Sequence, residues 1–504
     1  MLRINKKLIE IVFFSILLGL FAFYVLIDDE LKMWCDELYG LNVASQASFL
    51  KVIEAIRGGC DGPPPLYPLL CHYFRELLHN DALAMRLPST LGVVMFLYGC
   101  GIYVKRTYGP LGAIFALLLA SALARPYATE GRGYGLLLGL ATLAFLIWVE
   151  REKAVNKLIF SLLLAVTLAL MVATHYYAIF FLVPVLGVEL YKILRGQKFD
   201  PTLMIPVVSP FLVILSLADI VLLQHRMTQH FWSPSHISMI RPYFMEHMAC
   251  PLGAFLFLAA IFSLPPLEEL KRTWVFGKVS QDVLTVSTFN EFLFILFALL
   301  APYLCIVVSN FTTHVFVDRY AAWTTFAIVF FGAQLVLARF SAAPLLLGLG
   351  VFLMCLVQFR DLRSIEAGAR NFRESAGIFK LLDAGVVPAS LPLVIADPHE
   401  FLEVSYYSSA DTSRRLAYLN DKDTDLKYLG FDTDALIFEN LPRYTALNIF
   451  RAKEFLKTHN RFVLFDDQRL YVPSLFASQG WTVSSIDPSI GEPRVFLVSK
   501  EASP

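Results

Sequence analysis

Long apolar segments recur through the first 360 residues of the chain, and they constrain its fold more than any other feature. A transmembrane helix needs roughly 20 apolar residues, within a range of about 17–25. We predict eleven such helices, near residues 8–27, 87–104, 110–125, 133–149, 157–174, 176–194, 203–223, 247–264, 291–308, 320–338 and 342–358. Only 17% of all residues are charged, whereas soluble domains carry roughly 25%. The sequence therefore predicts a polytopic α-helical membrane protein.

The loops between these segments fall into two sets. One alternating set carries the basic residues, and short basic loops stay in the cytoplasm. This set contains Arg3, Lys6 and Lys7; Lys105 and Arg106; Arg151, Lys153 and Lys157; Lys192, Arg195 and Lys198; Lys271, Arg272 and Lys278; and Arg339. We therefore expect a cytoplasmic N-terminus and, after eleven crossings, an extracytoplasmic C-terminus in a cell membrane.

The opposite set of loops is longer and richer in aromatic and ionisable residues. The first of these outer loops spans 28–85, and another spans 224–246. Long loops of this composition usually carry function, so we expect the site at the outer end of the helices. Cys35, Cys60 and Cys71 fall in the first loop, where either a disulfide or free thiols are open alternatives.

The composition changes near residue 359. Short β-type runs such as "LPLVIAD", "RFVLFD" and "RVFLVSK" alternate with helical patterns, which predicts an extracytoplasmic α/β domain over 359–504. This segment contains no G-x-G-x-x-G or Walker sequence, so nucleotide binding is not indicated. The whole chain has a net charge of zero and no basic tract or zinc-finger spacing, and we expect no nucleic-acid partner.

Ionisable and aromatic residues gather at the predicted outer ends of the helices. The acidic pair Asp36 and Glu37 lies in "WCDELYG", soon after the first apolar segment. Three prolines in "DGPPPLYPLL" stiffen the same loop, and the following "LYPLLCHYFRELL" predicts a helix lying along the membrane surface. Ionisable groups at span ends that face the bundle are functional candidates. The others are Arg86, Glu130, Arg132, His175, Arg319 and Tyr320.

The order of these motifs resembles the glycosyltransferase C-type (GT-C) superfamily over about residues 1–358. The motifs are the acidic pair, "PPPLYPLL", "RLPS", "ARPYATEGRGYG", "THYYA" and a late "DRY". Among its branches, the chain is most similar to the protein mannosyltransferases and lipid A aminoarabinose transferases. The resemblance implies a polyprenyl-phosphate sugar donor, a lipid, glycan or protein acceptor bound on the outer face, and a first-loop Asp at the reaction centre. We designate 1–358 as the GT-C-like transmembrane domain.

These implied roles can be assigned to particular residues. Asp36 would be the general base for an acceptor hydroxyl, and a single displacement would invert the sugar carbon. Arg86, Arg132 and Arg319 would hold the lipid phosphate, because a guanidinium binds phosphate oxygens bidentately. Glu130, His175 and Tyr320 complete the expected binding residues. Glu37 would position Asp36, bind the acceptor or help to hold a divalent cation. A divalent metal cation is therefore the one cofactor that these residues suggest.

Several alternatives are open from the sequence alone. A transporter or flippase for a lipid-linked or polar substrate would also have many spans with ionisable residues, although no repeated halves are evident. A non-catalytic assembly protein is a third function class. The individual side chains also have structural explanations. Arg319 and Tyr320 could anchor a helix at the membrane surface, Glu130 and Arg132 could pair with each other, and Arg86 could extend to lipid headgroups.

Overall fold

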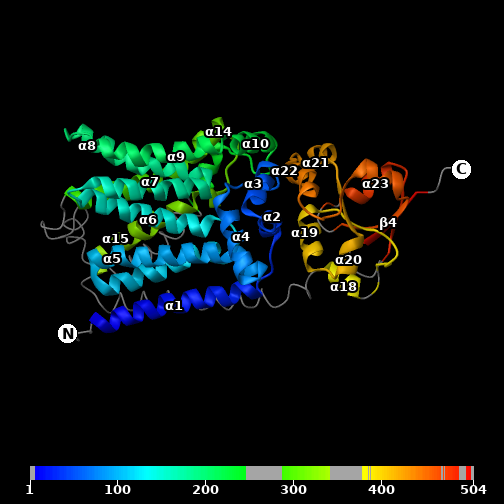
Figure 1. Cartoon of the computed structure of the whole chain (residues 1–504), viewed down its shortest axis with the longest axis horizontal. Coiled ribbons are helices and arrows are strands. Elements are labelled where there is room, and N and C mark those ends of the chain that lie inside the picture. Colours follow the sequence, from blue (N-terminus) through cyan, green and yellow to red (C-terminus); the bar gives the residue numbers. More distant parts are fainter. Residues whose placement is uncertain are drawn as a thin grey trace, which may run out of the picture.

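The chain forms a bundle of long helices with a small sheet-containing domain at one end (Figure 1). The computed structural model describes residues 6–243, 245, 286–340, 377–383, 385, 387–466, 469, 471–486 and 495–500. Helix α1 begins at the end of the bundle opposite the C-terminal domain. The predicted fold class, a helical membrane protein with a C-terminal α/β domain, is confirmed. The predicted domain boundary at 358/359 falls outside the described residues and stays a prediction.

The helices of the bundle follow most of the predicted apolar segments. They are α1 (Lys6–Glu30), α5 (Asp81–Ala128), α6 (Tyr134–Lys153), α7 (Lys157–Thr174), η1 (Tyr176–Phe181), α8 (Leu182–Leu194), η2 (Pro201–Leu203), α9 (Met204–Ser216), α10 (Ala218–Met227), η3 (Ile237–Met239), α11 (Ile240–Tyr243), α14 (Val286–Phe311), η5 (Asp318–Thr324) and α15 (Thr325–Phe340). Within the described ranges, six helices are long and apolar enough to span a membrane, or seven if one bent pair counts as a span. The count of eleven is therefore not established. The segments predicted at 247–264 and 342–358 lie outside the described residues.

Helix α5 is a hairpin of two helices and not one rod. The Thr90 hydroxyl donates to the Ala128 carbonyl at 3.0 Å, across 38 residues of sequence, which a straight helix would separate by about 57 Å. The break is at Gly109, with φ 77° and ψ −174°, a region that glycine adopts at little steric cost. The separate segments predicted at 87–104 and 110–125 therefore correspond to the two arms.

The segment predicted as one helix over 203–223 is broken. Its two parts, residues 201–216 and 218–227, are bent by 67°, because Leu217 leaves helical geometry (φ −109°, ψ 18°). Helix α10 then lies against α3 (Phe49–Arg57) of the first loop, where Arg57 Nε is 2.8 Å from Asp219 Oδ2. This bend corrects the prediction of a continuous span and brings α10 over the first loop.

Helices α5 and α6 approach each other closely through glycine. A Cβ built on Gly92 would lie 2.3 Å from the Cα of Leu136, and one on Gly139 would lie 2.3 Å from the Gly92 carbonyl oxygen. Small residues permit such backbone approach in membrane helix pairs. This contact fixes the turn between α5 and α6, which carries Glu130 and Arg132.

The first loop is helical and ordered. It contains α2 (Cys35–Ala44), α3 and α4 (Leu66–Leu78), and α4 coincides with the helix predicted for "LYPLLCHYFRELL". The Tyr67 hydroxyl of α4 donates to the Met85 carbonyl at 2.6 Å, which holds this helix on α5. Cys35, Cys60 and Cys71 are free thiols.

The C-terminal domain has one six-stranded sheet in the order β3-β2-β1-β4-β6-β5. The strands are β1 (Leu393–Ile395), β2 (Leu416–Asn420), β3 (Ile449–Arg451), β4 (Arg461–Phe465), β5 (Thr482–Ser485) and β6 (Val495–Ser499). The first four are parallel, and β6 is antiparallel to β4 and β5. The helices are α18 (Gly377–Asp383), α19 (Pro398–Tyr407), α20 (Ala410–Arg415), α21 (Lys422–Leu429), α22 (Thr433–Asn440), η6 (Leu441–Arg443), α23 (Ala452–Thr458) and α24 (Val472–Ser478). The predicted α/β alternation is confirmed, although the three-residue strand β3 was not predicted.

The C-terminal domain packs directly on the first loop (Figure 1). The Met33 amide donates to the Tyr407 hydroxyl at 2.7 Å, and Lys32 pairs with Glu403. The ring of Tyr39 on α2 meets the ring of Phe438 on α22 edge to face, with 5.9 Å between the ring centres. One hydrophobic cluster runs through both parts, so the domain is held in a defined position over α2.

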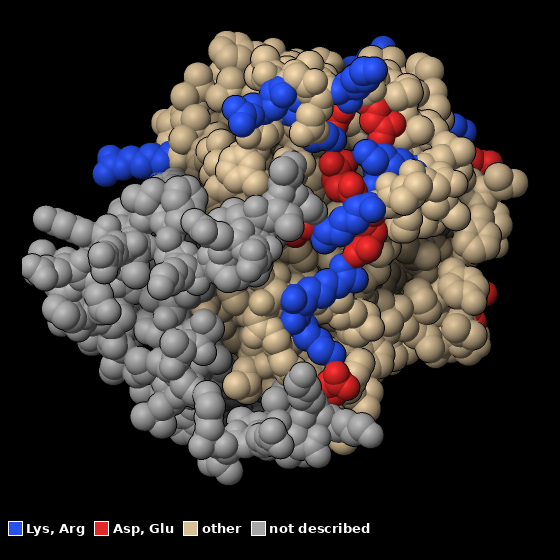
Figure 2. Space-filling view, turned by 90° about the vertical axis from the view of Figure 1, so that its left-hand side faces the viewer, with Lys and Arg blue, Asp and Glu red and all other residues tan. Residues whose placement is uncertain are grey.

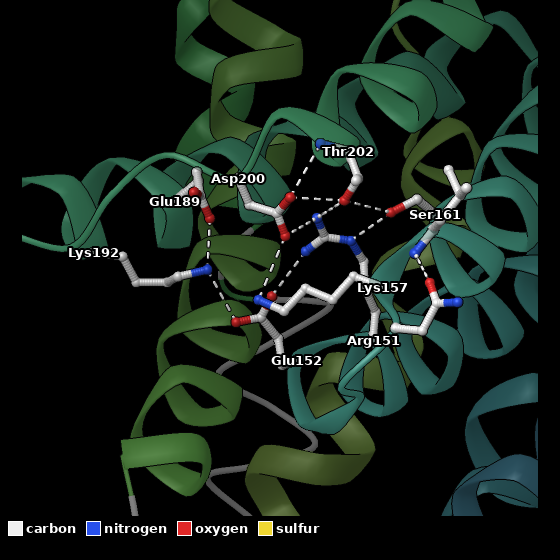
Figure 3. Close-up of polar contacts among 10 residues, drawn as sticks. Arg151, Glu152, Lys157, Ser161, Glu189, Lys192, Asp200 and Thr202 are labelled. Atoms are coloured by element: carbon white, nitrogen blue, oxygen red, sulfur yellow. Dashed lines mark hydrogen bonds and ion pairs between the residues drawn. The ribbon is translucent and has the colours of Figure 1, made fainter.

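The opposite end of the bundle carries a network of paired charges. Lysine and arginine side chains alternate there with acidic ones (Figure 2). Arg151 is fully buried and contacts Asp200 at 2.8 Å and Ser161 at 2.7 Å. Lys192 pairs with Glu189 at 2.6 Å and Glu152 at 3.0 Å (Figure 3). The basic loops that the structure describes therefore meet at one end, away from the C-terminal domain.

Candidate functional site

A cavity of about 660 Å³ lies between the bundle and the C-terminal domain. Its volume is within the roughly 300–1,000 Å³ of small-molecule sites. The first loop, the α5–α6 turn, η1, α10, η5 and the C-terminal domain all contribute to its wall. The lining residues predicted from the sequence are Asp36, Arg132, His175, Arg319 and Tyr320. Segments up to about 400 residues apart in the sequence thus form one site.

Asp36 and Arg319 form an ion pair in the cavity wall. Asp36 lies in the first turn of α2, and its Oδ2 accepts a hydrogen bond from Arg319 Nη2 at 2.7 Å. The Arg319 guanidinium carbon is 5.5 Å from the ring centre of Trp34 and 5.6 Å from that of Tyr134, within cation–π range. The two charged side chains retain 19% and 27% of their exposure respectively, so both are accessible from the cavity.

Arg132 is paired with Asp61, a residue that the sequence did not mark as a site residue. Its Nη1 and Nη2 lie 2.9 and 3.3 Å from the two carboxylate oxygens of Asp61. Nη1 also donates to the Asp36 carbonyl oxygen at 3.1 Å. Asp61 raises the pKa of Arg132 against the opposing effect of burial. The available signal was an acid two residues before the three prolines, since this stiff loop holds it in place.

Glu37 and Arg86 lie behind the cavity wall and not in it. Arg86 donates to Glu37 through Nε at 2.7 Å and Nη2 at 2.6 Å, and to the carbonyls of Leu31 and Lys32. Both side chains are almost fully buried. Glu37 also accepts from the Gly131 amide at 2.6 Å. The pair therefore joins α2, α5 and the α5–α6 turn, and we call it the Glu37–Arg86 clamp.

Glu130 lies behind Arg319. Its Oε1 is 3.6 Å from Arg319 Nη1, which is longer than a hydrogen bond, and that oxygen is buried without a hydrogen-bond partner. Burial raises the pKa of Glu130 to about 7, although Arg319 and Arg132 oppose the shift. The alternative of an ion pair between Glu130 and Arg132 is not observed, because Arg132 pairs with Asp61 and Glu130 lies nearest Arg319.

His175 and Tyr320 complete the part of the wall beside Arg319. Their ring centres are 4.8 Å apart, and His175 Nδ1 accepts from the Tyr177 amide at 3.3 Å. Burial, with Arg132 and Arg319 nearby, lowers the pKa of His175 to about 3. His175 is therefore neutral at physiological pH and adds no positive charge to the cavity.

The C-terminal domain supplies a further polar cluster that sequence reasoning missed. His399 Nε2 lies 3.4 Å from Asp434 Oδ1, and the Tyr39 hydroxyl donates to the same oxygen at 3.4 Å. All three side chains line the cavity. No local signal marked His399 or Asp434, since each lies in the first turn of a short helix without a distinctive motif.

The residues of this site do not form a metal-binding cluster. Within the described ranges, no group of three His, Cys, Asp or Glu side chains could hold a metal ion. Asp36, Glu37 and Asp61 each face a guanidinium, which competes with a cation for the carboxylate. We derive no chemical step through a metal.

Comparison with solved structures identifies the fold. ArnT from Cupriavidus metallidurans, solved bound to undecaprenyl phosphate and in the apo state, aligns with a TM-score of 0.51, 12% identity and 97% coverage of both chains. An Archaeoglobus fulgidus oligosaccharyltransferase, solved with Zn and sulfate, aligns with a TM-score of 0.40 and 11% identity over 91% of this chain and 69% of that one, which is too weak to support an argument. No protein-family model and no curated protein matches the sequence. The chain therefore shares its overall fold with ArnT over nearly its whole length.

Proposed function

We propose that this protein is an integral-membrane glycosyltransferase that moves a sugar from a polyprenyl-phosphate donor to a hydroxyl acceptor. The observation that carries the proposal is the Asp36–Arg319 pair in the cavity wall, 2.7 Å apart and accessible from the cavity. In this proposal the Asp36 carboxylate is the base, and the neighbouring Arg319 guanidinium binds the donor phosphate. The shared fold with ArnT, which was solved bound to undecaprenyl phosphate, supports the choice of donor.

Asp36 acts as the general base in this mechanism. It accepts the proton of the acceptor hydroxyl while that oxygen attacks the anomeric carbon of the donor. The bond between the anomeric carbon and the phosphate oxygen breaks, and its electron pair leaves with the polyprenyl phosphate. This leaving group is already an anion and needs no proton. A single displacement inverts the anomeric carbon.

Arg319 links donor binding to the activity of the base. In the structure, Asp36 Oδ2 accepts a hydrogen bond from Arg319 Nη2 at 2.7 Å, so this oxygen is engaged with the guanidinium. A donor phosphate that draws the guanidinium away from Asp36 would leave the carboxylate free to accept a proton. The released phosphate carries more negative charge than the bound diester, so Arg319 also stabilises the charge that develops during transfer.

The remaining predicted residues take supporting positions. Arg132 can contact the phosphate while Asp61 keeps its guanidinium in place, and the Tyr320 hydroxyl can add a donor. The Glu37–Arg86 clamp positions α2, which carries Asp36. The polyprenyl tail enters from the bilayer beside the bundle. Basic loops at the other end of the bundle support a cavity on the extracytoplasmic face, because short basic loops stay in the cytoplasm.

Binding of the donor lipid can be tested separately from catalysis. Purified protein is titrated with undecaprenyl phosphate while tryptophan fluorescence is followed, because Trp34 lies against Arg319. Arg319→Met should weaken binding by about tenfold or more, since hydrogen bonds to charged groups are the strong ones. Arg414→Met, an exposed arginine on the C-terminal domain, is the matched control. Equal affinity for all three proteins would reject Arg319 as the phosphate ligand.

Transfer itself is tested with polyprenyl-phosphate sugars in proteoliposomes. Release of free polyprenyl phosphate, measured by mass spectrometry, should require the wild-type protein. Sugar that crosses the bilayer without cleavage of the phosphate bond would instead identify a flippase.

A further inference from the structure

The wall of the cavity that the C-terminal domain forms has a chemistry of its own. Asp434 of α22 has two neighbours at 3.4 Å from its carboxylate oxygen Oδ1. They are Nε2 of His399 from α19 and the hydroxyl of Tyr39 from α2. Thr433, Phe431 and Ile437 of the same domain also line the cavity. None of these groups has a part in the base or phosphate chemistry described above.

The cluster is held in place before any ligand arrives. The Asp397 side chain caps α19 by accepting from the backbone amides of His399 at 2.9 Å and Glu400 at 3.1 Å. The His399 ring meets the Tyr39 ring edge to face, with ring centres 6.2 Å apart, and the Tyr39 side chain is almost fully buried. Such preorganisation lowers the cost of ordering side chains on binding.

Both arginines of the cavity wall have an acidic partner. Arg319 pairs with Asp36 and Arg132 with Asp61. Burial would lower the pKa of His399, but the contact with Asp434 outweighs burial and raises it to about 9. His399 and Asp434 are therefore an imidazolium–carboxylate pair near neutral pH. The C-terminal part of the wall offers donors and acceptors with no net charge, next to exposed aromatic surface at Trp232.

This arrangement fits a neutral molecule with several hydroxyl groups. A carboxylate accepts hydrogen bonds from hydroxyls, whereas an imidazolium donates to their oxygens. Aromatic faces cover the apolar side of such a molecule, as is usual for pockets with a few placed polar groups. A phosphorylated acceptor fits poorly, because its phosphate would face the Asp434 carboxylate. The nearest cation, the His399 imidazolium, is already paired with Asp434.

We propose that His399 and Asp434 form an acceptor subsite that binds the hydroxyl groups of a neutral sugar. The inference rests on the proposed function, since it assigns an acceptor to that reaction. The subsite lies on the side of the cavity formed by the C-terminal domain, while Arg319 lies on the side formed by η5 of the bundle. Asp36 contributes to the raised pKa of His399, so the base is within electrostatic reach of the subsite. The C-terminal domain thereby acts as the acceptor-binding half of the site.

Binding of sugars to the full-length protein tests this subsite without any transfer. Saturation-transfer NMR is recorded on detergent-purified protein with neutral methyl glycosides, namely methyl mannoside, glucoside and arabinofuranoside. At least one should give signals with the wild-type protein. Asp434→Asn should weaken that binding by about tenfold, because the sugar hydroxyl then donates to a neutral amide oxygen and not to a carboxylate. Asp411→Asn, an exposed acid on the same domain, should bind as the wild type does.

The outcomes separate this inference from the proposed function. Binding that Asp434→Asn weakens supports the subsite even if no transfer is found, in which case the proposed function alone fails. The inference is overturned if no glycoside binds the wild-type protein, or if Asp434→Asn and His399→Gln both bind normally. Binding of glucosamine 1-phosphate that improves in Asp434→Asn would overturn it in favour of an acidic acceptor. Thermal unfolding of each variant confirms that it is folded.

Where transfer is measurable, the steady-state constants give a second test. Asp434→Asn should raise the KM for the acceptor and leave the KM for the donor lipid unchanged. A fall in kcat with both KM values unchanged would indicate a general structural role and would contradict the subsite.

Discussion

Removal of Arg86 should show whether the Glu37–Arg86 clamp holds α2 in place. In Arg86→Met, the Glu37 carboxylate loses two hydrogen bonds of 2.7 and 2.6 Å while it stays buried with 0% exposure. Breaking a buried ion pair costs about 3–5 kcal/mol, because the remaining charge is left uncompensated. At about 2 °C per kcal/mol for a large chain, the apparent melting temperature should fall by about 6–10 °C.

The measurement is thermal unfolding of the purified protein in detergent, with Arg451→Met as control. Arg451 pairs with Glu439 on the surface, at 70% and 47% exposure, and such pairs contribute about 0–1 kcal/mol. The double variant Glu37→Gln, Arg86→Met should be less destabilised than the sum of the single variants, by about 0.5–3 kcal/mol of coupling. A melting temperature for Arg86→Met equal to that of Arg451→Met would refute the clamp.

Three further variants test other parts of the fold by the same unfolding measurement. Gly92→Ala should destabilise the protein because its Cβ would lie 2.3 Å from a backbone atom of α6, whereas Gly19→Ala, with open space around it, should not; equal stabilities would contradict the close helix approach. Arg151→Met should cost about 3–5 kcal/mol, whereas Arg106→Met, whose ion pair is half exposed, should cost about 1 kcal/mol or less; similar losses would contradict a buried network. The folded-state pKa of Glu130 is raised from 4.5 to about 7, so its ionisation lowers stability as pH rises between these values. Glu130→Gln should therefore lose less stability than the wild type between about pH 5 and pH 8, and identical pH profiles would contradict the raised pKa.

The sequence was most informative where one apolar segment forms one helix. The segments that became α6, α7 and α14 have enough apolar length to specify a span without help from the rest of the chain. The bend at Leu217 was not predictable in this way, because it depends on how α10 packs over α3. Strand β3 was missed because its three residues are half-buried or exposed and form no apolar run, unlike the equally short but buried β1.

The candidate site was only partly predictable for the same reason. Asp36 and Glu37 are neighbours, but successive residues of a helix point about 100° apart, so one carboxylate faces the cavity and the other faces Arg86. Pairings such as Asp61 with Arg132 join residues 71 positions apart, and only tertiary packing determines them. His399 and Asp434 became site residues because the C-terminal domain docks on α2, which no local motif encodes.

Sugar transfer by Asp36→Asn tests the central claim most directly. Purified wild-type and variant proteins are assayed for release of polyprenyl phosphate from the donor sugar lipid that the wild type uses, with the exposed Asp423→Asn as control. Loss of a general base should reduce kcat by about 10²–10⁴-fold, while the affinity for undecaprenyl phosphate is retained. Transfer by Asp36→Asn at the rate of Asp423→Asn would show that this carboxylate is not the base.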